Sequence, residues 1–424
     1  MTKLALHWQI LIAIGLAAVA GSLTGTSAGI GPVTFNDIYS FLGTLFLNAL
    51  KMIIVPLIVA TLISSIASLG AGGDMGRLGM RAIGYYALTT LLAVLVGLVA
   101  VNTFTPGLRD GVPVGAALNL TLDSSEVEGA LASVEGRGMG DVVGVVLRMV
   151  PPNIVEAAAE TNMLGLLFFS VCFGFFMTRL GDKHRDTLLT FWQAVAETMM
   201  QMTMWIMRFA PIGVFGLVAG TVASTGFAAF VPLLKFFLIV LGALLFHLLV
   251  VLSLLLKVLG RVNPFKHLRA MMPALLTGFS SASSTATLPV TMECLRENSG
   301  VSERVTHFVL PIGATGNMDG TALYECAAAI FLAQAYGLEL SFATQFTVVL
   351  LALLTSIGVA GIPAASLVAI TVILGAIGLP LEAIGLLLVT DRVLDMVRTA
   401  VNVYSDSCAA VVVARGEGEE LPIV

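Results

Sequence analysis

The sequence predicts an all-α polytopic membrane protein, and three observations support this fold class. Of the 424 residues, 58% are hydrophobic and 11% are charged, whereas a soluble domain carries roughly 25% charged residues. The mean hydropathy is +0.99. Long uncharged runs recur along the chain, and most could form one membrane-crossing helix. This composition excludes a soluble enzyme, a nucleic-acid-binding protein and a disordered chain, because their exteriors cannot be so apolar.

The uncharged runs give the order of the elements that we expect. They cover residues 10–36, 38–50, 52–73, 82–108, 161–178, 209–234, 236–256, 270–292 and 340–381. The last run is about twice the length of one crossing. Gly358, Gly361 and Pro363 interrupt its middle and predict a re-entrant helical hairpin. The run 270–292 has a polar, serine-rich centre that ends at Pro289, and it predicts a second hairpin.

Each of these two runs precedes a segment with charged or amide side chains, 313–325 in one case and 391–406 in the other. A hairpin followed by a charged helix therefore occurs twice, which is an internal repeat of architecture. Paired interrupted segments are typical of a transporter binding site. The alternative is two packing helices that are rich in small residues.

The charge distribution predicts the orientation. The stretch 109–137 holds five acidic and two basic residues, whereas bases gather at Arg77 and Arg81 and in the stretches 179–185 and 257–269. Basic stretches remain cytoplasmic, so we expect a cytoplasmic N-terminus and eight full crossings. The first hairpin would then enter from the cytoplasm and the second from outside. The tail after Arg415 would be cytoplasmic and solvated.

The last apolar helix carries the strongest functional signal. At about 100° per residue, its polar side chains share one face about 100° wide. They are Asp391, Asp395, Arg398, Thr399, Asn402 and Asp406. An ionised side chain at the bilayer centre costs at least about 2.5–3.5 kcal/mol, so these groups must face partners or water. Three aspartates against one arginine leave excess negative charge, which indicates bound cations.

Two weaker signals precede that helix. Asn317 and Asp319 lie among Gly313, Gly316 and Gly320, a pattern that predicts an unwound turn whose free carbonyls bind an ion; a loop cap is the alternative. The third signal is the group Tyr86, Thr89 and Thr90 within an apolar helix. It is weak alone, because threonine commonly bonds its own helix backbone.

Three motifs carry a family resemblance: Asn-Met-Asp-Gly-Thr at 317–321, the serine-rich tip before Thr-Leu-Pro at 287–289, and Asp-Met-Val-Arg-Thr-Ala-Val-Asn at 395–402. They resemble the dicarboxylate/amino acid:cation symporters, which include the excitatory amino acid transporters and prokaryotic glutamate and aspartate transporters. The resemblance spans nearly the whole chain. It implies inverted repeats, an elevator-type mechanism, a homotrimer, and a location in the cell (inner) membrane with both termini cytoplasmic.

The resemblance also implies a division into a scaffold and a mobile transport domain. In chain order, the segments are scaffold helices 1 and 2 at 1–73, transport-domain helix 3 at 74–105, an external loop with scaffold helices 4 and 5 at 106–223, helix 6 at 224–262, hairpin 1 at 263–300, helix 7 at 301–338, hairpin 2 at 339–380, helix 8 at 381–415 and a cytoplasmic tail at 416–424.

The resemblance assigns a substrate site. Asp395 would pair with the substrate ammonium, and Arg398 would bind its side-chain carboxylate while Asp391 holds the guanidinium in place. The remaining polar atoms would be bound by Thr321, Thr399, Asn402 and the backbone around Ser283 and Ser284. Gly361 and Ile362 would close the second hairpin over the substrate.

Three sodium sites follow from the same resemblance. The first comprises Asp406, Asn402, Asn317 and the Gly313 carbonyl; the second comprises Asp319, Asn317, Thr89, Thr90 and Tyr86; the third comprises Thr315 with carbonyls of Ser356, Ile357 and Val359. Glu325 is a candidate proton site, and a glutamate that only bonds neighbouring helices is the alternative. Sodium ions are then co-transported ligands, with no cofactor. Proton drive, potassium return and an anion leak remain open.

The sequence departs from the family pattern at four positions. A second arginine is usual at one of the positions held here by Ala282 and Met396, so Arg398 is the only evident carboxylate anchor. Ser405 and Ser366 stand where glycine is usual.

These observations favour uptake of acidic amino acids over three alternatives. A C4-dicarboxylate symporter usually lacks the aspartate at Asp395, and a neutral amino acid symporter usually lacks the arginine at Arg398. An intramembrane enzyme would need a serine dyad or a GxGD aspartate pair within membrane spans. The histidines form no convincing serine dyad, and the sequence Gly-Met-Gly-Asp at 138–141 lies outside the uncharged runs. The expected partners are a small acidic amino acid, cations, the lipid bilayer and further copies of the chain, but no nucleic acid.

Overall fold

The computed structural model is predominantly helical, as the sequence predicts. It describes residues 6–69, 76–115, 150–159, 163–226, 230–358, 365–380 and 383–423. Two short antiparallel hairpins interrupt the helices: β1 (Gly29–Ile30) pairs with β2 (Val33–Thr34), and β3 (Leu108–Arg109) pairs with β4 (Val112–Pro113). The first lies between two helices and the second follows a helix, and both are too short to alter the helical class.

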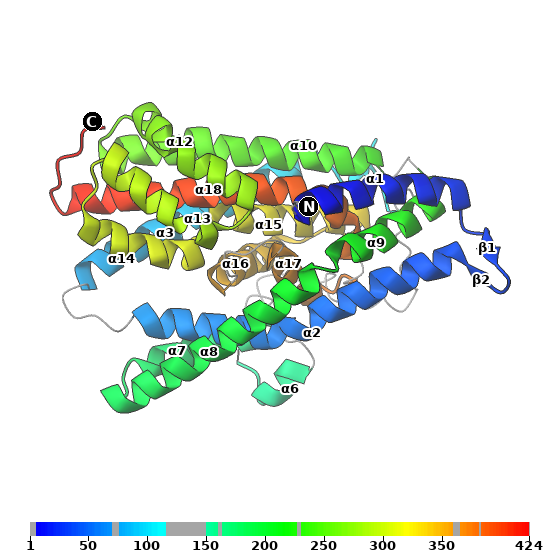
Figure 1. Cartoon of the computed structure of the whole chain (residues 1–424), viewed down its shortest axis with the longest axis horizontal. Helices are drawn as coiled ribbons and strands as arrows, with labels where there is room; N and C mark the ends of the chain where they lie inside the picture. The colour runs from blue at the N-terminus through cyan, green and yellow to red at the C-terminus, as the bar shows by residue number, and fades with distance from the viewer. Residues whose placement is uncertain are drawn as a thin grey trace, which may run out of the picture.

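One set of helices, the outer group, packs around α2 (Figure 1). Its members are α1 (Leu6–Thr24), α2 (Phe35–Leu69), α6 (Ile154–Ala159), α7 (Met163–Met177), α8 (Asp182–Met207) and α9 (Ala210–Thr225). Helix α2 contacts α7, α8 and α9, and α1 lies along α9. These elements come from the segments that we expected to form the scaffold.

The other set, the inner group, surrounds α18 (Figure 1). Its members are α3 (Gly76–Phe104), α10 (Phe230–Phe246), η3 (His247–Leu252), α11 (Ser253–Leu255), η4 (Leu256–Gly260), α12 (Pro264–Ser281), α13 (Ser284–Glu293), η5 (Cys294–Asn298), α14 (Glu303–Gly316), α15 (Asp319–Ala335), α16 (Phe342–Gly358), α17 (Ala365–Ile377) and α18 (Ile384–Gly416). Helix α18 contacts α3, α10, α12, α14 and α15. The polar face of α18 is therefore enclosed by other helices.

Both expected hairpins appear as pairs of packed helices. In the first, Asn263 caps α12 by accepting from the backbone N–H of Phe265 at 3.0 Å, and Ser283 caps α13 by accepting from that of Ala286 at 3.2 Å. Ala282 turns the chain between them in a left-handed conformation, with φ of 51°. The second hairpin consists of α16 and α17, and its tip at 359–364 lies outside the described residues.

The predicted unwound turn in helix 7 is confirmed. Helix α14 ends at Gly316 and α15 begins at Asp319. The two residues between them leave the helical conformation, with φ of −122° at both Asn317 and Met318. The break turns the Asn317 side chain and the first turn of α15 toward α18.

Length and composition allow two described helical segments to cross a membrane, Leu78–Phe104 and Val231–Gly260. A third candidate is the pair Asp182–Ile206 and Ala210–Ser224, which bends by 56° at its break. The uncharged run 209–234 does not form one helix. It is divided after α9, where Gly226 adopts a φ of 66° that other residues rarely tolerate.

The C-terminal tail is not solvated as we expected. Leu421 and Ile423 are buried, and the Ile423 carbonyl accepts from the backbone N–H of Asn263 at 2.9 Å. The Glu419 carboxylate accepts from the backbone N–H of Ser302 at 2.9 Å, at the N-terminus of α14. A helix N-terminus attracts negative charge, so this acidic tail docks onto the inner group.

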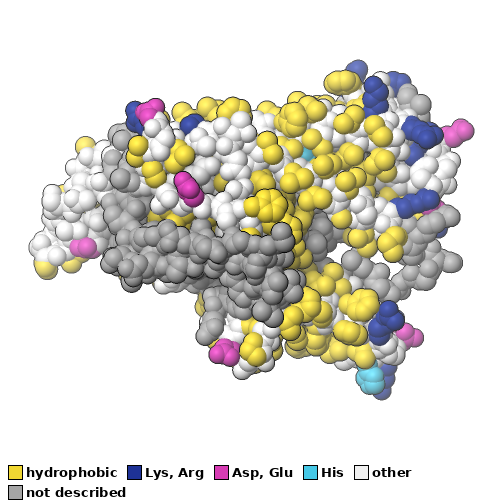
Figure 2. All heavy atoms as spheres, turned by 180° about the vertical axis from the view of Figure 1, so that it is seen from behind, with side chains coloured by type: hydrophobic (Ala, Val, Ile, Leu, Met, Phe, Trp, Pro, Cys, Tyr) yellow, Lys and Arg dark blue, Asp and Glu magenta, His cyan; other side chains and the backbone are white. Residues whose placement is uncertain are grey.

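Figure 2 shows hydrophobic side chains over much of the middle of the molecule and basic side chains gathered at one end. That end carries the turn between α7 and α8 and the end of α18 (Figure 1). Exposed bases occur in each of the stretches that we expected to be cytoplasmic: Arg81, Arg179, Lys183, Lys257, Arg261, Lys266 and Arg269. The basic stretches are therefore consistent with one membrane side.

Candidate functional site

The polar face of α18 is hidden inside the protein. Its side chains lie on successive turns of one helix, and neighbouring helices cover them. Their residues are between 1% and 7% exposed: Asp391, Asp395, Arg398, Thr399, Asn402 and Asp406. This burial agrees with the expectation from the apolar flanks. It also requires that each charge find a partner within the protein or in a bound ligand.

Arg398 is held from three sides. Its Nη2 donates to Asp391 Oδ1 at 2.9 Å and to Asp395 Oδ1 at 3.0 Å. The guanidinium carbon lies 3.9 Å from the centre of the Tyr324 ring. The other two donor atoms, Nε and Nη1, are buried and have no hydrogen-bond partner in the described part of the chain. A buried donor without a partner is costly, so these atoms favour an anionic ligand beside them.

Arg392 is a second buried arginine that the sequence reasoning overlooked. It is 7% exposed, and its Nη1 donates to Asp395 Oδ2 at 3.3 Å. On the helix it lies about 100° from Asp391, at the edge of the polar face, and one turn before Asp395. The count of three aspartates against one arginine is therefore wrong. Asp391, Arg392, Asp395 and Arg398 form a charge-balanced set, here called the charged quartet.

Further along α18, an acidic cluster joins α18 to the break between α14 and α15. Asn317 Nδ2 donates to Asp406 Oδ1 at 2.9 Å and to Ser405 Oγ at 3.0 Å. Asp319 accepts from Ser405 Oγ at 2.6 Å and from Thr90 Oγ1 at 2.8 Å. The hydroxyl of Ser405, where the family usually has glycine, thus becomes an additional oxygen within the cluster.

Helix α3 completes the cluster. Asn317 Oδ1 accepts from the hydroxyls of Thr89 and Thr90, each at 3.4 Å. Tyr86 OH donates to the Val309 carbonyl at 2.9 Å. A Cβ built on Gly313 would lie 2.5 Å from Asp406 Oδ1 and 2.8 Å from Tyr86 OH. Glycine at this position therefore lets the carboxylate approach the backbone of α14.

His247 is another residue of the cluster that the sequence reasoning missed. Its Nε2 lies 3.2 Å from Asp319 Oδ2, and both side chains are fully buried. It begins the π-helical turn η3, a geometry frequent at functional sites. The signal was a lone histidine in the uncharged run 236–256. The cluster thus holds two carboxylates against one imidazole, and its oxygen atoms suit a hard cation.

Asn402 joins the charged quartet to the acidic cluster. Its Oδ1 accepts from the backbone N–H of Gly320 at 2.8 Å, and its Nδ2 donates to Thr321 Oγ1 at 3.1 Å. Thr399 instead donates to the Asp395 carbonyl of its own helix at 2.9 Å. The first turn of α15 is therefore fixed against α18 at a level between the charged quartet and the acidic cluster.

The remaining predicted residues are placed less directly. Ser283 and Ser284 lie at the first hairpin tip, whose helices both pack on α18. Ser356 Oγ donates to the Leu353 carbonyl within α16 at 2.9 Å. The other members of the third sodium set and the second hairpin tip fall outside the described residues or side chains: Thr315, Ile357, Val359, Gly361 and Ile362.

Glu325 is fully buried on α15. Its Oε2 accepts from Thr355 Oγ1 on α16 at 2.7 Å. Its Oε1 has no hydrogen-bond partner in the described ranges. The bond between helices and a proton-carrying role are both compatible with this arrangement.

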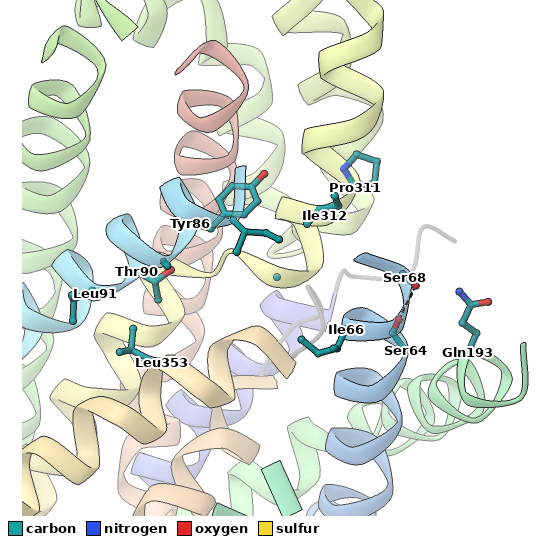
Figure 3. A pocket seen from close by; sticks show the side chains of 13 residues that line it. Ser64, Ile66, Ser68, Tyr86, Thr90, Leu91, Gln193, Pro311, Ile312 and Leu353 are labelled. Atoms are coloured by element: carbon teal, nitrogen blue, oxygen red, sulfur yellow. Dashed lines mark hydrogen bonds between the residues drawn. The ribbon is translucent and has the colours of Figure 1, made fainter. Parts of the chain in front are cut away.

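A cavity of about 640 Å³ separates the acidic cluster from the outer group (Figure 3). Tyr86 and Thr90 of α3 face Ser64 and Ser68 of α2 across it, and Gln193 of α8 lines the same space. Its lining is mainly apolar. The two groups of helices are therefore not tightly packed at the level of the cluster.

The contact between α15 and α18 requires glycine at position 320. A Cβ there would lie 2.7 Å from the Arg398 carbonyl oxygen and 2.9 Å from its Cα, so Gly320→Ala must displace one helix. We expect it to lower the free energy of unfolding by about 1–3 kcal/mol, measured by thermal unfolding of the purified protein. Gly316→Ala is the matched control, because its Cβ meets nothing within 4 Å. Equal stability of both variants would contradict the close approach.

Comparisons with known proteins agree with this geometry. The model of the sodium:dicarboxylate symporter family matches residues 6–416. The proton/glutamate-aspartate symporter of Escherichia coli (strain K12) is 37% identical over 415 residues, covering 98% of this chain and 93% of that protein. The proton/sodium-glutamate symport protein of Geobacillus stearothermophilus is 35% identical, covering 99% and 96%. Human excitatory amino acid transporter 3 is 34% identical, covering 90% and 80%. The match of almost the whole chain confirms the resemblance seen in the motifs and the interpretation as a transporter rather than an enzyme: the chain belongs to the sodium:dicarboxylate symporter family.

Proposed function

We propose that this chain is a secondary active symporter that takes up acidic amino acids, L-glutamate or L-aspartate, together with cations. Sodium is the primary coupling ion of the proposal, and protons are the alternative. The observation that carries it is the buried Arg398, which donates to Asp395 through Nη2 and has two further donor atoms without a hydrogen-bond partner among the described residues. The names of the E. coli and Geobacillus relatives support the same substrate class.

In this proposal, Arg398 Nη1, which has no hydrogen-bond partner among the described residues, donates to the side-chain carboxylate of the substrate. A hydrogen bond between a guanidinium and a carboxylate is roughly twice as strong as one between neutral groups. Asp391 and the Tyr324 ring hold the guanidinium from the other side. Asp395 receives the substrate ammonium. The hydroxyl and amide groups nearby complete the site: Ser283, Ser284, Thr321, Thr399 and Asn402.

The cations bind in the acidic cluster. Asp319 and Asp406 supply the charge, and the oxygens of Asn317, Thr89, Thr90 and the Gly313 carbonyl are the further ligands. The short hydrogen bonds among these groups keep them together. Because Asn402 joins this cluster to the charged quartet, cation binding would order the substrate site.

The proposed movement is of elevator type. The inner group would act as the transport domain within a homotrimer held by the outer group, with eight crossings, two re-entrant hairpins and both termini cytoplasmic in the cell membrane. Three observations support this picture. The cavity lies between the groups, basic side chains gather at one end, and large apolar side chains such as Leu16, Phe41 and Leu45 are exposed on α1 and α2.

A C4-dicarboxylate is the second candidate substrate, and Arg392 favours it. Because this arginine already neutralises Asp395, a substrate without an ammonium group does not leave that carboxylate unpaired. Uptake of labelled aspartate, glutamate, succinate and serine into proteoliposomes, with sodium, proton and potassium gradients imposed singly, separates these candidates. We expect aspartate or glutamate to accumulate under a sodium or proton gradient. Preferred uptake of succinate or serine would overturn the proposal.

Removal of the guanidinium should abolish recognition of the acidic side chain. We expect Arg398→Ala to lower aspartate and glutamate uptake by at least about 30-fold, because the loss leaves charged partners buried without a counter-ion. The assembly should persist, as checked by size-exclusion chromatography. Arg296→Ala, at an exposed position on η5, is the control. Unchanged uptake by Arg398→Ala would refute the anchor role.

Loss of one carboxylate from the acidic cluster should weaken the dependence on cations. For Asp406→Asn, we expect the sodium concentration for half-maximal uptake to rise about tenfold, since a charged ligand is lost. Asp186→Asn on the exposed surface of α8 serves as the control. If the Asp406 variant retained the wild-type sodium titration, the ligand assignment would be wrong.

If Glu325 carries a proton during transport, uptake by Glu325→Gln should become independent of pH between 5 and 9. The amide cannot exchange a proton but can still accept from Thr355. Thr355→Val removes the hydrogen bond to Glu325 but keeps the carboxyl group, so uptake by this variant should still depend on pH. A wild-type profile for the glutamine variant would instead assign Glu325 a structural role.

A further inference from the structure

The charged quartet contains a cation placed where the substrate ammonium is expected. Asp395 is engaged through both oxygens: Oδ1 accepts from Arg398 Nη2 at 3.0 Å, and Oδ2 accepts from Arg392 Nη1 at 3.3 Å. The Arg392 and Asp395 side chains are 8% and 10% exposed, so water screens this ion pair weakly. An ammonium group that reaches Asp395 must therefore replace or share one of two guanidinium bonds.

The two arginines are not equivalent partners of Asp395. Arg398 is also fixed by Asp391 and by the Tyr324 ring. Arg392 has only Asp395 as a carboxylate partner among the described residues, at the longer distance, and its Nε is buried without a hydrogen-bond partner. The bond from Arg392 is thus the weaker one, and it is the bond that an incoming ammonium displaces.

We propose that Arg392 is a specificity-determining residue that sets how strongly the site prefers an amino dicarboxylate over the same dicarboxylate without its ammonium group. This inference rests on the proposed function. When aspartate binds, its ammonium replaces Arg392 and leaves that guanidinium with fewer partners, which weakens aspartate binding. When succinate binds, Arg392 stays on Asp395 and compensates the extra negative charge, which strengthens succinate binding. Arg392 thereby reduces the difference in affinity between aspartate and succinate.

The test is a displacement experiment on the full-length purified protein at saturating sodium. Labelled L-glutamate is displaced by L-aspartate and by succinate. The inhibition constant of succinate divided by that of aspartate is compared between variants, and a higher ratio means a stronger preference for aspartate. We expect Arg392→Gln to raise the preference for aspartate about tenfold, the effect of one hydrogen bond between charged groups. Arg392→Lys keeps the charge but not the fork of donors, so its ratio should lie between those of the wild type and the glutamine variant.

Arg296→Gln is the matched control, because its side chain is 43% exposed on η5, and its ratio should equal that of the wild type. If Arg392→Gln does not yield folded protein by size-exclusion chromatography, the lysine variant alone tests the inference, and its ratio should exceed that of the wild type. An unchanged or reduced ratio in the folded variant refutes the inference while aspartate binding by the wild type upholds the proposed function. A wild type that binds neither aspartate nor glutamate overturns both.

Discussion

The burial of charge on α18 is the constraint on which the rest of the molecule depends. Arg398 is 1% exposed and Asp391 is 4% exposed, within a chain that is 58% hydrophobic. Such groups are tolerated only with partners of matching geometry. The fold supplies them by surrounding α18 with helices, by breaking helix 7 at Asn317, and by a glycine at position 320 that lets α15 approach the backbone of α18.

The buried charges fall into two sets with different balance. The charged quartet has equal numbers of aspartates and arginines, whereas the acidic cluster has two carboxylates against the imidazole of His247. The excess negative charge therefore lies in the cluster, which favours cations there, whereas the Arg398 donors without a hydrogen-bond partner among the described residues favour an anionic ligand. Asn402 lies between the sets and fixes α15 to α18. Binding at either set should then alter the other, and this coupling must be reciprocal.

Much of this arrangement was predictable from the sequence, because apolar periodicity and interrupted runs are local signals. The helical class, both hairpins, the break in helix 7 and the burial of the α18 face were expected on that basis. Arg392 was overlooked because it lies at the edge of the polar face, although its partner Asp395 is only three residues away. The other errors concern distant contacts: His247 was missed because its partner Asp319 is 72 residues away. The docked tail was missed for the same reason, since Glu419 meets Ser302 only in the folded chain.

We propose that cations complete the acidic cluster and thereby prepare the charged quartet for its ligand. The most direct test is the dissociation constant of aspartate for the purified wild-type protein, measured by calorimetry across a grid of sodium concentration and pH. We expect aspartate to bind more tightly as sodium or proton concentration rises, and sodium to bind more tightly by the same factor when aspartate is present. A dissociation constant that stays constant across the whole grid would contradict it.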